Sequence, residues 1–105
     1  MSLTAHLVVV HRNRGDTCRR TVERFRAQAE LAVTVVDNGS RADELASLGS
    51  GLDDDVEVVR TGRNLGFGPG ANVGLDRWLA GPHEFCLLAP HDARPLKGTV
   101  QRLLE

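Results

Sequence analysis

Polar residues with the chemistry of a binding site follow directly after a strongly apolar stretch. Residues 32–36, which are mostly β-branched, precede an Asp-Asn-Gly-Ser sequence at 37–40. Such a run predicts a strand buried on both faces, and ligands of α/β sheets bind at the carboxyl ends of strands. Asp37 and Asn38 would point polar groups into a crevice, Gly39 would permit a positive φ, and Ser40 could cap the next helix. The same four residues are also an ordinary turn sequence, so the motif alone leaves both interpretations open.

A glycine-rich stretch is the second candidate for ligand binding. Residues 64–72 read Asn-Leu-Gly-Phe-Gly-Pro-Gly-Ala-Asn. Its glycines let the backbone turn tightly and approach a ligand, and Pro69 suits the first turn of a helix whose amino end could receive a phosphate. The dinucleotide fingerprint is not met, because the loop follows the third expected strand and ends in asparagine. A purely structural turn is therefore equally consistent with this stretch.

Two further clusters contain groups that can bind metal ions. His91 and Asp92 lie where a fourth strand is expected to end, and this pair could hold a divalent cation or form a surface turn. Residues 53–55 are three consecutive aspartates ahead of a strand, which a solvated turn explains better than a metal site. Guanidinium groups lie near these candidates, two in the loop at 11–15 and two at 60–63.

Hydrophobic periodicity predicts the elements that would position these groups. Apolar runs predict four strands, at 5–10, 32–36, 56–59 and 84–88. Four helices are predicted from apolar residues at helical spacing: Cys18, Val22, Phe25 and Ala29; Ala42, Leu45 and Leu48; Ala71, Leu75, Trp78 and Leu79; Leu96, Val100, Leu103 and Leu104. Asp16 or Thr17 is expected to cap the first helix, and Asp43 to help cap the second. This alternation predicts a parallel sheet with right-handed crossovers, which would bring the polar strand ends to one edge.

The composition fits a single α/β domain in a reducing compartment. The length of 105 residues allows one core but is small for a complete α/β enzyme. Thirteen basic against 14 acidic residues leave no net field that would recruit nucleic acid, and no apolar run approaches the roughly 20 residues needed to span a bilayer. Cys18 and Cys86 lie in apolar patterns without CxxC spacing, which favours buried free thiols.

In their order and spacing, these motifs resemble the amino-terminal half of a family 2 glycosyltransferase with the GT-A fold. The resemblance rests on Val-Val-Val at 8–10, Val-Asp-Asn-Gly-Ser at 36–40, Asn-Leu-Gly-Phe-Gly at 64–68 with Asn72, and Leu-Leu-Ala-Pro-His-Asp at 87–92. It implies a three-layer α/β/α, Rossmann-like domain over residues 1–105, with a mainly parallel four-stranded sheet of order 3-2-1-4. It also implies a piece of a longer glycosyltransferase, truncated before the half that binds the acceptor.

The resemblance also assigns roles to individual residues. The family's first loop reads Thr-Tyr-Asn-Arg, and residues 11–14 here read His-Arg-Asn-Arg. Asp37 matches the aspartate that accepts hydrogen bonds from the nucleotide base. By strict alignment His91 stands where the metal-binding aspartate is expected and Asp92 follows it, and Asp92 is the favoured ligand because Mg²⁺ or Mn²⁺ on a diphosphate prefers carboxylate oxygen. The residues expected to bind the nucleotide sugar are His11, Asn13, Arg14, Asp37, Asn38, Ser40, Arg63, Asn64, Gly66 and Asn72, and those expected to bind metal are Asp92 and His91.

The function implied by the resemblance is sugar transfer from a nucleotide diphosphate sugar to a hydroxyl of an acceptor glycan or lipid-linked glycan. We expect an inverting, metal-assisted enzyme of cell-wall or polysaccharide biosynthesis, with its catalytic base beyond Glu105. Arg14 and Arg63 could add hydrogen bonds to the diphosphate. The 105 residues alone would therefore bind donor without turnover.

Two alternatives come from other functional classes. A non-catalytic nucleotide-binding or interaction domain could retain the fold and lack the chemistry. A GT-A-like nucleotidyltransferase is disfavoured, because the glycine-rich basic signature expected near the first strand is missing. We expect a cytoplasmic location, at the cytoplasmic face of the membrane for a full-length protein, and an exposed sheet edge that could pair two copies in a homodimer.

Overall fold

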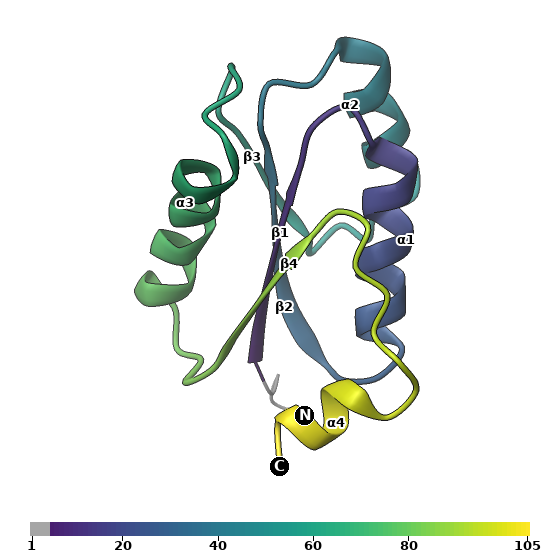
Figure 1. The fold of residues 1–105 in the computed structure, drawn as a ribbon, viewed down its shortest axis with the longest axis vertical. Helices are drawn as coiled ribbons and strands as arrows, with labels where there is room; N and C mark the ends of the chain where they lie inside the picture. The colour runs from purple at the N-terminus through teal and green to yellow at the C-terminus, as the bar shows by residue number, and fades with distance from the viewer. Residues whose placement is uncertain (1–4) are drawn as a thin grey trace.

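A parallel sheet with helices on both faces is the framework of residues 5–105, the part of the chain that this computed structural model describes. Strands and helices alternate along it: β1 (Ala5–His11), α1 (Gly15–Arg26), β2 (Leu31–Asp37), α2 (Ala42–Gly49), β3 (Glu57–Arg60), α3 (Phe67–Ala80), β4 (Cys86–Pro90) and α4 (Thr99–Leu103). The sheet order is β3-β2-β1-β4, with every neighbouring pair parallel. Figure 1 shows α3 on one side of the sheet and α1 with α2 on the other. The predicted three-layer fold and strand order are confirmed.

The two central strands are the most deeply buried elements. All seven residues of β1 are buried, as are six of the seven in β2. Side chains alternate between the faces, so Leu7 and Val9 join the core beneath α1 while Val8 and Val10 join the core beneath α3. Both strands are apolar on both faces because helices cover both faces. The sequence predicted these strands well for the same reason.

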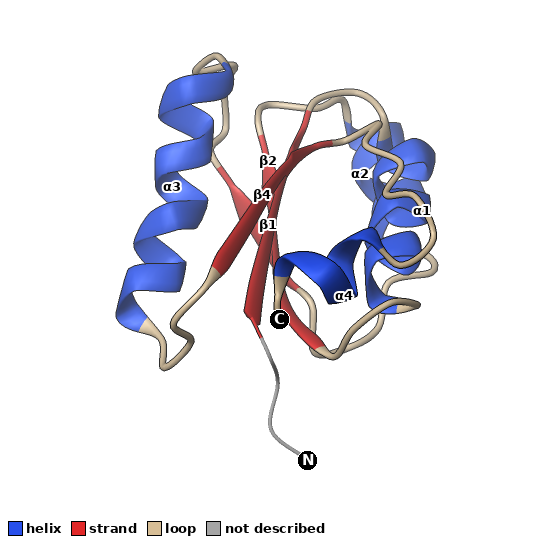
Figure 2. Cartoon of the chain, turned by 60° about the horizontal axis from the view of Figure 1, so that its bottom comes forward, coloured by secondary structure: helices blue, strands red, loops and turns tan. Residues whose placement is uncertain are grey.

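The two helical layers approach the sheet in different ways. On one face α1 packs large side chains, Val22 and Phe25 among them, and Val100 of α4 joins the same cluster. Figure 2 shows α4 on the same side of the sheet as α1. On the other face α3 presents small residues to the sheet. A Cβ on Gly74 would clash with a methyl group of Val8, and one on Gly70 would lie 2.9 Å from the Asn38 amide nitrogen. The glycines after residue 66 therefore bring α3 close to the strand ends.

The predicted helix caps are wrong. The first helix begins at Gly15 after Arg14, and the second begins at Ala42 after Arg41, neither with a side-chain cap. The expected caps are engaged elsewhere: the Asp16 carboxylate binds Arg19 and Arg20 of its own helix, and the Ser40 hydroxyl accepts a hydrogen bond from another loop. Ion pairs within the helix for Asp16, and a contact between two loops for Ser40, replace the expected caps.

Several boundaries and buried faces also differ from the prediction. The fourth strand covers 86–90 rather than 84–88, and the third covers 57–60 rather than 56–59. Ala29 lies beyond the end of the first helix. Three leucines expected in the core are largely exposed, at 69%, 77% and 66% of their surface: Leu79, Leu96 and Leu103. Leu79 lies in the last turn of α3, and Leu96 and Leu103 follow β4.

Strand register brings the carboxyl ends of the strands level with one another. His11 is the register partner of Asp37, which is in turn the partner of Arg60, and Val10 pairs with Pro90. The loops that leave these positions therefore start side by side. Among the described residues no helix is both long and apolar enough to cross a bilayer.

Candidate nucleotide-sugar site

A pocket of about 300 Å³ opens at this carboxyl edge of the sheet. Five of its lining residues were predicted from the sequence and three were not; the lining consists of Val10, His11, Arg12, Asn38, Asn64, Gly66, Phe67 and His91. They come from the ends of β1, β2 and β4 and from the start of α3. None of these lining residues is acidic, so the pocket suits an anionic ligand.

His11 and Asp37 form a buried pair at the base of this pocket. Nδ1 of His11 accepts a hydrogen bond from the Arg14 backbone N–H at 3.3 Å, so Nε2 carries the ring proton, and it lies 2.8 Å from Oδ1 of Asp37. The side chains are only 0% and 2% exposed. Burial lowers the pKa of His11 below its usual 6.5, although the nearby Asp37 carboxylate opposes this shift. The imidazole is therefore neutral at neutral pH.

The loops after β1 and β2 are joined by reciprocal hydrogen bonds. The Asn13 backbone N–H donates to the Ser40 hydroxyl at 2.8 Å, and the Arg41 backbone N–H donates to the Asn13 side-chain carbonyl at 2.8 Å. Asn13 has a φ of 56°, which asparagine tolerates better than most residues. The Ser40 N–H also donates to Oδ2 of Asp37 at 3.3 Å. These predicted site residues thus support the loops rather than line the pocket.

Asn38 ties the end of β2 to the loop before α3. Its side-chain amide donates to the Gly66 carbonyl at 2.8 Å, while its side-chain carbonyl accepts from the Leu65 N–H at 3.0 Å and from the Thr61 hydroxyl at 3.2 Å. The side chain is buried and still contributes to the pocket wall. Asn38 therefore fixes where the glycine-rich loop begins.

The glycine-rich loop needs a backbone conformation that favours glycine. Gly66 has a φ of 85° directly before α3, and its N–H donates to the Asn64 side-chain carbonyl at 3.0 Å. Gly39 opposite has a φ of 82°, and a Cβ there would lie 2.6 Å from the Arg63 carbonyl carbon. Arg63 and Asn72 are exposed and lie outside the pocket lining. The loop after β2 and the loop before α3 can be this close only because residue 39 lacks a side chain.

The loop after β4 is held from beneath by α1. The buried Thr21 hydroxyl donates to the backbone carbonyl of His91 and lies 3.3 Å from that of Ala93. His91 lines the pocket, whereas the neighbouring Asp92 is exposed and is not part of its lining. No cluster of three or more potential metal ligands exists within residues 5–105. Mg²⁺ on a diphosphate often takes only one or two protein carboxylates, so Asp92 fits a cation held mainly by the ligand's phosphates.

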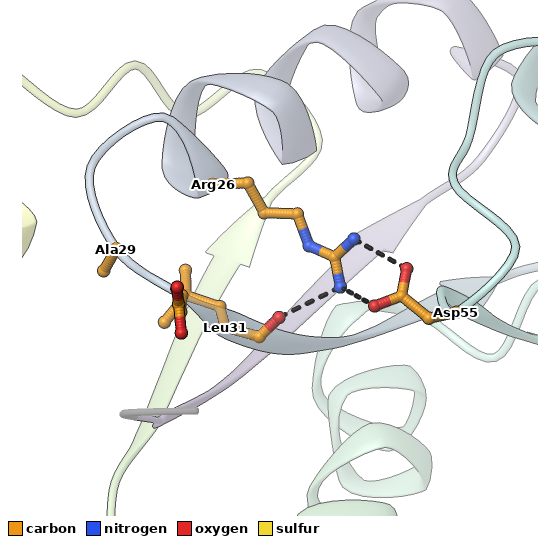
Figure 3. Close-up of a pocket in the computed structure, with 5 residues that line it drawn as sticks. Arg26, Ala29, Leu31 and Asp55 are labelled. Carbon is orange, nitrogen blue, oxygen red and sulfur yellow. Dashed lines mark hydrogen bonds and ion pairs between the residues drawn. The ribbon is translucent and has the colours of Figure 1, made fainter. Parts of the chain in front are cut away.

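The aspartates at 53–55 serve a structural role at the opposite end of the sheet. Figure 3 shows the Arg26 guanidinium held by the Asp55 carboxylate and the Leu31 carbonyl, with N–O distances of 2.8 to 3.0 Å. Asp53 also pairs with Arg26, at 3.2 Å. The expected turn is confirmed, and two of its carboxylates pair with Arg26.

Two binding-site features were not found from the sequence. Arg12 and Phe67 line the pocket, although neither was among the predicted site residues. Only their positions in the chain could have indicated a role in binding, because Arg12 directly follows β1 and Phe67 is the first residue of α3. Cys18 carries no site chemistry, because burial raises the pKa of its thiol to about 12.

The fold and the site define a class of protein. A parallel α/β sheet with a basic pocket at the carboxyl ends of its strands is a Rossmann-like domain. Within that class, the family model described as glycosyl transferase family 2 matches residues 6–105. The chain therefore belongs to glycosyl transferase family 2. A search of curated proteins found no match to it.

Proposed function

We propose that this domain binds the donor of a glycosyl transfer reaction, a nucleotide diphosphate sugar, in the pocket at the carboxyl edge of the sheet. The observation that carries the proposal is convergence: His11, Asn38, Asn64 and His91, far apart in the sequence, line one pocket. Membership of the family supports sugar transfer as the reaction. The sugar would pass to an acceptor hydroxyl with inversion at the anomeric carbon.

Several groups in and beside the pocket suit a diphosphate. Arg12, Arg14 and Arg63 are exposed, and none of them takes part in an ion pair among the described residues. Guanidinium groups form charge-assisted hydrogen bonds with phosphate oxygens, which would stabilise both the bound donor and the charge that develops on the leaving diphosphate. Asn64 and Asn38 offer polar atoms for orienting the donor.

Asp92, with His91 beside it, is the proposed attachment point for a divalent cation. A cation there would neutralise charge on the diphosphate as the glycosidic bond breaks. We propose that Asp37, whose family counterpart accepts hydrogen bonds from the nucleotide base, supports this end of the pocket from behind His11, because its side chain is only 2% exposed and pairs with His11. The acceptor would be a glycan or lipid-linked glycan, and the base that deprotonates its hydroxyl is not assigned to any described residue.

The test is calorimetric titration of the chain with UDP and GDP, each with and without Mn²⁺. We expect one of these diphosphates to bind, binding to strengthen with Mn²⁺, and the Mn²⁺ effect to disappear in Asp92→Asn. Asp54→Asn removes a carboxylate of similar exposure far from the pocket and serves as the matched control. Absence of binding for both nucleotides would instead favour an interaction domain that keeps the fold without the donor site. Binding that ignores Mn²⁺ would remove the cation from the proposal.

A further inference from the structure

We propose that Arg12 is the residue that recognises the phosphates of the donor, and that the buried His11–Asp37 pair is the support that holds Arg12 in place. This inference rests on the proposed function, and it assigns a specificity role to a residue of the 11–14 loop whose type departs from the family's Thr-Tyr-Asn-Arg sequence. The first argument is electrostatic. Arg12 is exposed, lines the pocket, and forms no ion pair with any described residue.

Two acidic side chains of the loop after β2 and of α2 are committed elsewhere. Asp37 is buried and faces His11 and the Ser40 N–H. Glu44 accepts a hydrogen bond from the Gly15 N–H and pairs with Arg41. No carboxylate lines the pocket. The Arg12 guanidinium therefore faces a space without an internal counter-ion, which an anionic ligand can supply.

The second argument is positional. The residues on either side of Arg12 are fixed by hydrogen bonds. His11 accepts from the Arg14 N–H at its ring nitrogen and from the Asn38 N–H at its carbonyl. Asn13 donates its N–H to Ser40 and accepts from the Arg41 N–H at its side-chain carbonyl. Arg12 is the one residue of the 11–14 loop that both lines the pocket and projects an exposed side chain. Its backbone is thus preorganised, so less conformational entropy is lost on binding.

His11 is a positioning residue in this arrangement. Both ring nitrogens face protein groups, Arg14 N–H on one side and Asp37 on the other, and the side chain is fully buried. It has no free nitrogen to offer a ligand. We therefore assign its effect on phosphate binding to the backbone of the next residue, Arg12, which it holds in place.

The experiment compares UDP with uridine, and GDP with guanosine, by titration calorimetry on the full 105-residue chain and on Arg12→Gln. We expect Arg12→Gln to weaken diphosphate binding roughly 10- to 100-fold, as for loss of a charge-assisted hydrogen bond, and to change nucleoside binding less than about twofold. Arg24→Gln makes the same charge change at an exposed site on α1, away from the pocket, and should leave both affinities unchanged. Raising the salt concentration should weaken diphosphate binding to the wild-type chain more than to Arg12→Gln.

The support role is tested by a double-mutant cycle. His11→Asn should lower the diphosphate-to-nucleoside affinity ratio, and adding it to Arg12→Gln should lower that ratio no further, because both act through one side chain. Asp37→Asn, which keeps the shape of the side chain, gives a second route to the same measurement if His11→Asn folds poorly. Additive losses in the cycle would overturn the support role.

The remaining outcomes separate this inference from the function on which it rests. Equal loss of nucleoside and diphosphate affinity in Arg12→Gln would mean that Arg12 contacts the base, and no loss would mean that it contacts nothing. Either result overturns the inference while donor binding stands. If the wild-type chain binds none of the four compounds, the proposed function itself fails.

Discussion

Two pairs of loops meet at the same edge of the sheet and use their polar residues differently. In the loops after β1 and β2, the polar groups of Asn13, Asp37 and Ser40 bind other protein groups. In the loops after β3 and β4, Arg63 and Asp92 are exposed and make no side-chain hydrogen bond or ion pair within residues 5–105. Residues that match a family motif can therefore hold the loops of a site in place through hydrogen bonds to other protein groups. The side chains of neighbouring residues then remain available to contact the ligand.

Asn38 belongs to the first pair of loops and reaches into the second. Its three side-chain hydrogen bonds end on residues that precede α3. If the comparison is right, changes to the bonded polar groups of the first pair should cost mainly folding stability. Changes to the exposed groups without such bonds, Arg12 of the first pair among them, should cost mainly binding.

The largest expected effect is that of Gly39→Ala. Alanine at a φ of 82° is strained, and its Cβ would lie 2.6 Å from the Arg63 carbonyl carbon. We expect a loss of about 4 kcal/mol in the free energy of unfolding, measured by urea denaturation. Gly62→Ala is the matched control, because Gly62 has a φ of 81° with no atom near the Cβ position, and it should cost about 1 kcal/mol. Equal losses in the two variants would show that the close approach of the loops does not matter.

Asn38→Ala should have the next largest effect. It leaves the Leu65 N–H and the Gly66 carbonyl without their partners, so we expect a loss of about 3 kcal/mol on urea denaturation. The counterpart in the other loops is Asn64→Ala, which removes one exposed hydrogen bond and should cost about 1 kcal/mol or less. A larger loss of unfolding free energy in Asn64→Ala than in Asn38→Ala would contradict the proposed difference between the two pairs of loops.

A smaller effect is expected from acid. Burial lowers the pKa of both His11 and His6 from 6.5, so the unfolded chain binds protons more readily than the folded chain. The free energy of unfolding should therefore be highest above pH 6.5 and decrease as the pH falls below it. Urea midpoints measured across that range would check this, and the decrease should be weaker in His11→Gln than in the wild-type chain. The lowered pKa values of Asp16 and Asp55 act only at lower pH. A midpoint that rises as the pH falls through 6.5 would contradict the prediction.

The smallest effect on folding is expected from Asp92→Asn. The carboxylate is exposed and makes no hydrogen bond or ion pair with other described residues, so the free energy of unfolding should change by less than about 0.5 kcal/mol. Thermal denaturation is sufficient to measure this. A loss of unfolding free energy comparable to that in Asn38→Ala would mean that Asp92 stabilises the fold. It would remove the distinction between the two pairs of loops.

The sequence predicted the fold closely and the site incompletely. Buried, β-branched strands at 5–10 and 32–36 were found because covered faces leave a continuous apolar run. The start of the first helix at Gly15 was missed, because the expected cap Asp16 binds Arg19 and Arg20 instead. The second helix begins at Ala42, the first residue of its predicted apolar pattern, but without the expected cap. Arg12 was missed as well, since nothing in its residue type distinguishes it from the other exposed arginines.

The sequence by itself determined the alternation of strands and helices. This alternation places the polar loops at one edge of a parallel sheet. Periodicity is a local property, and right-handed crossovers place successive strand ends on the same side. Only the tertiary structure decided which polar side chains bind other protein groups and which remain available to a ligand. A hydrogen bond such as that between Asn13 and Ser40 depends on strand register, which pairs His11 with Asp37 across 26 residues of chain. Such pairings depend on packing across the whole sheet, and no local pattern records them.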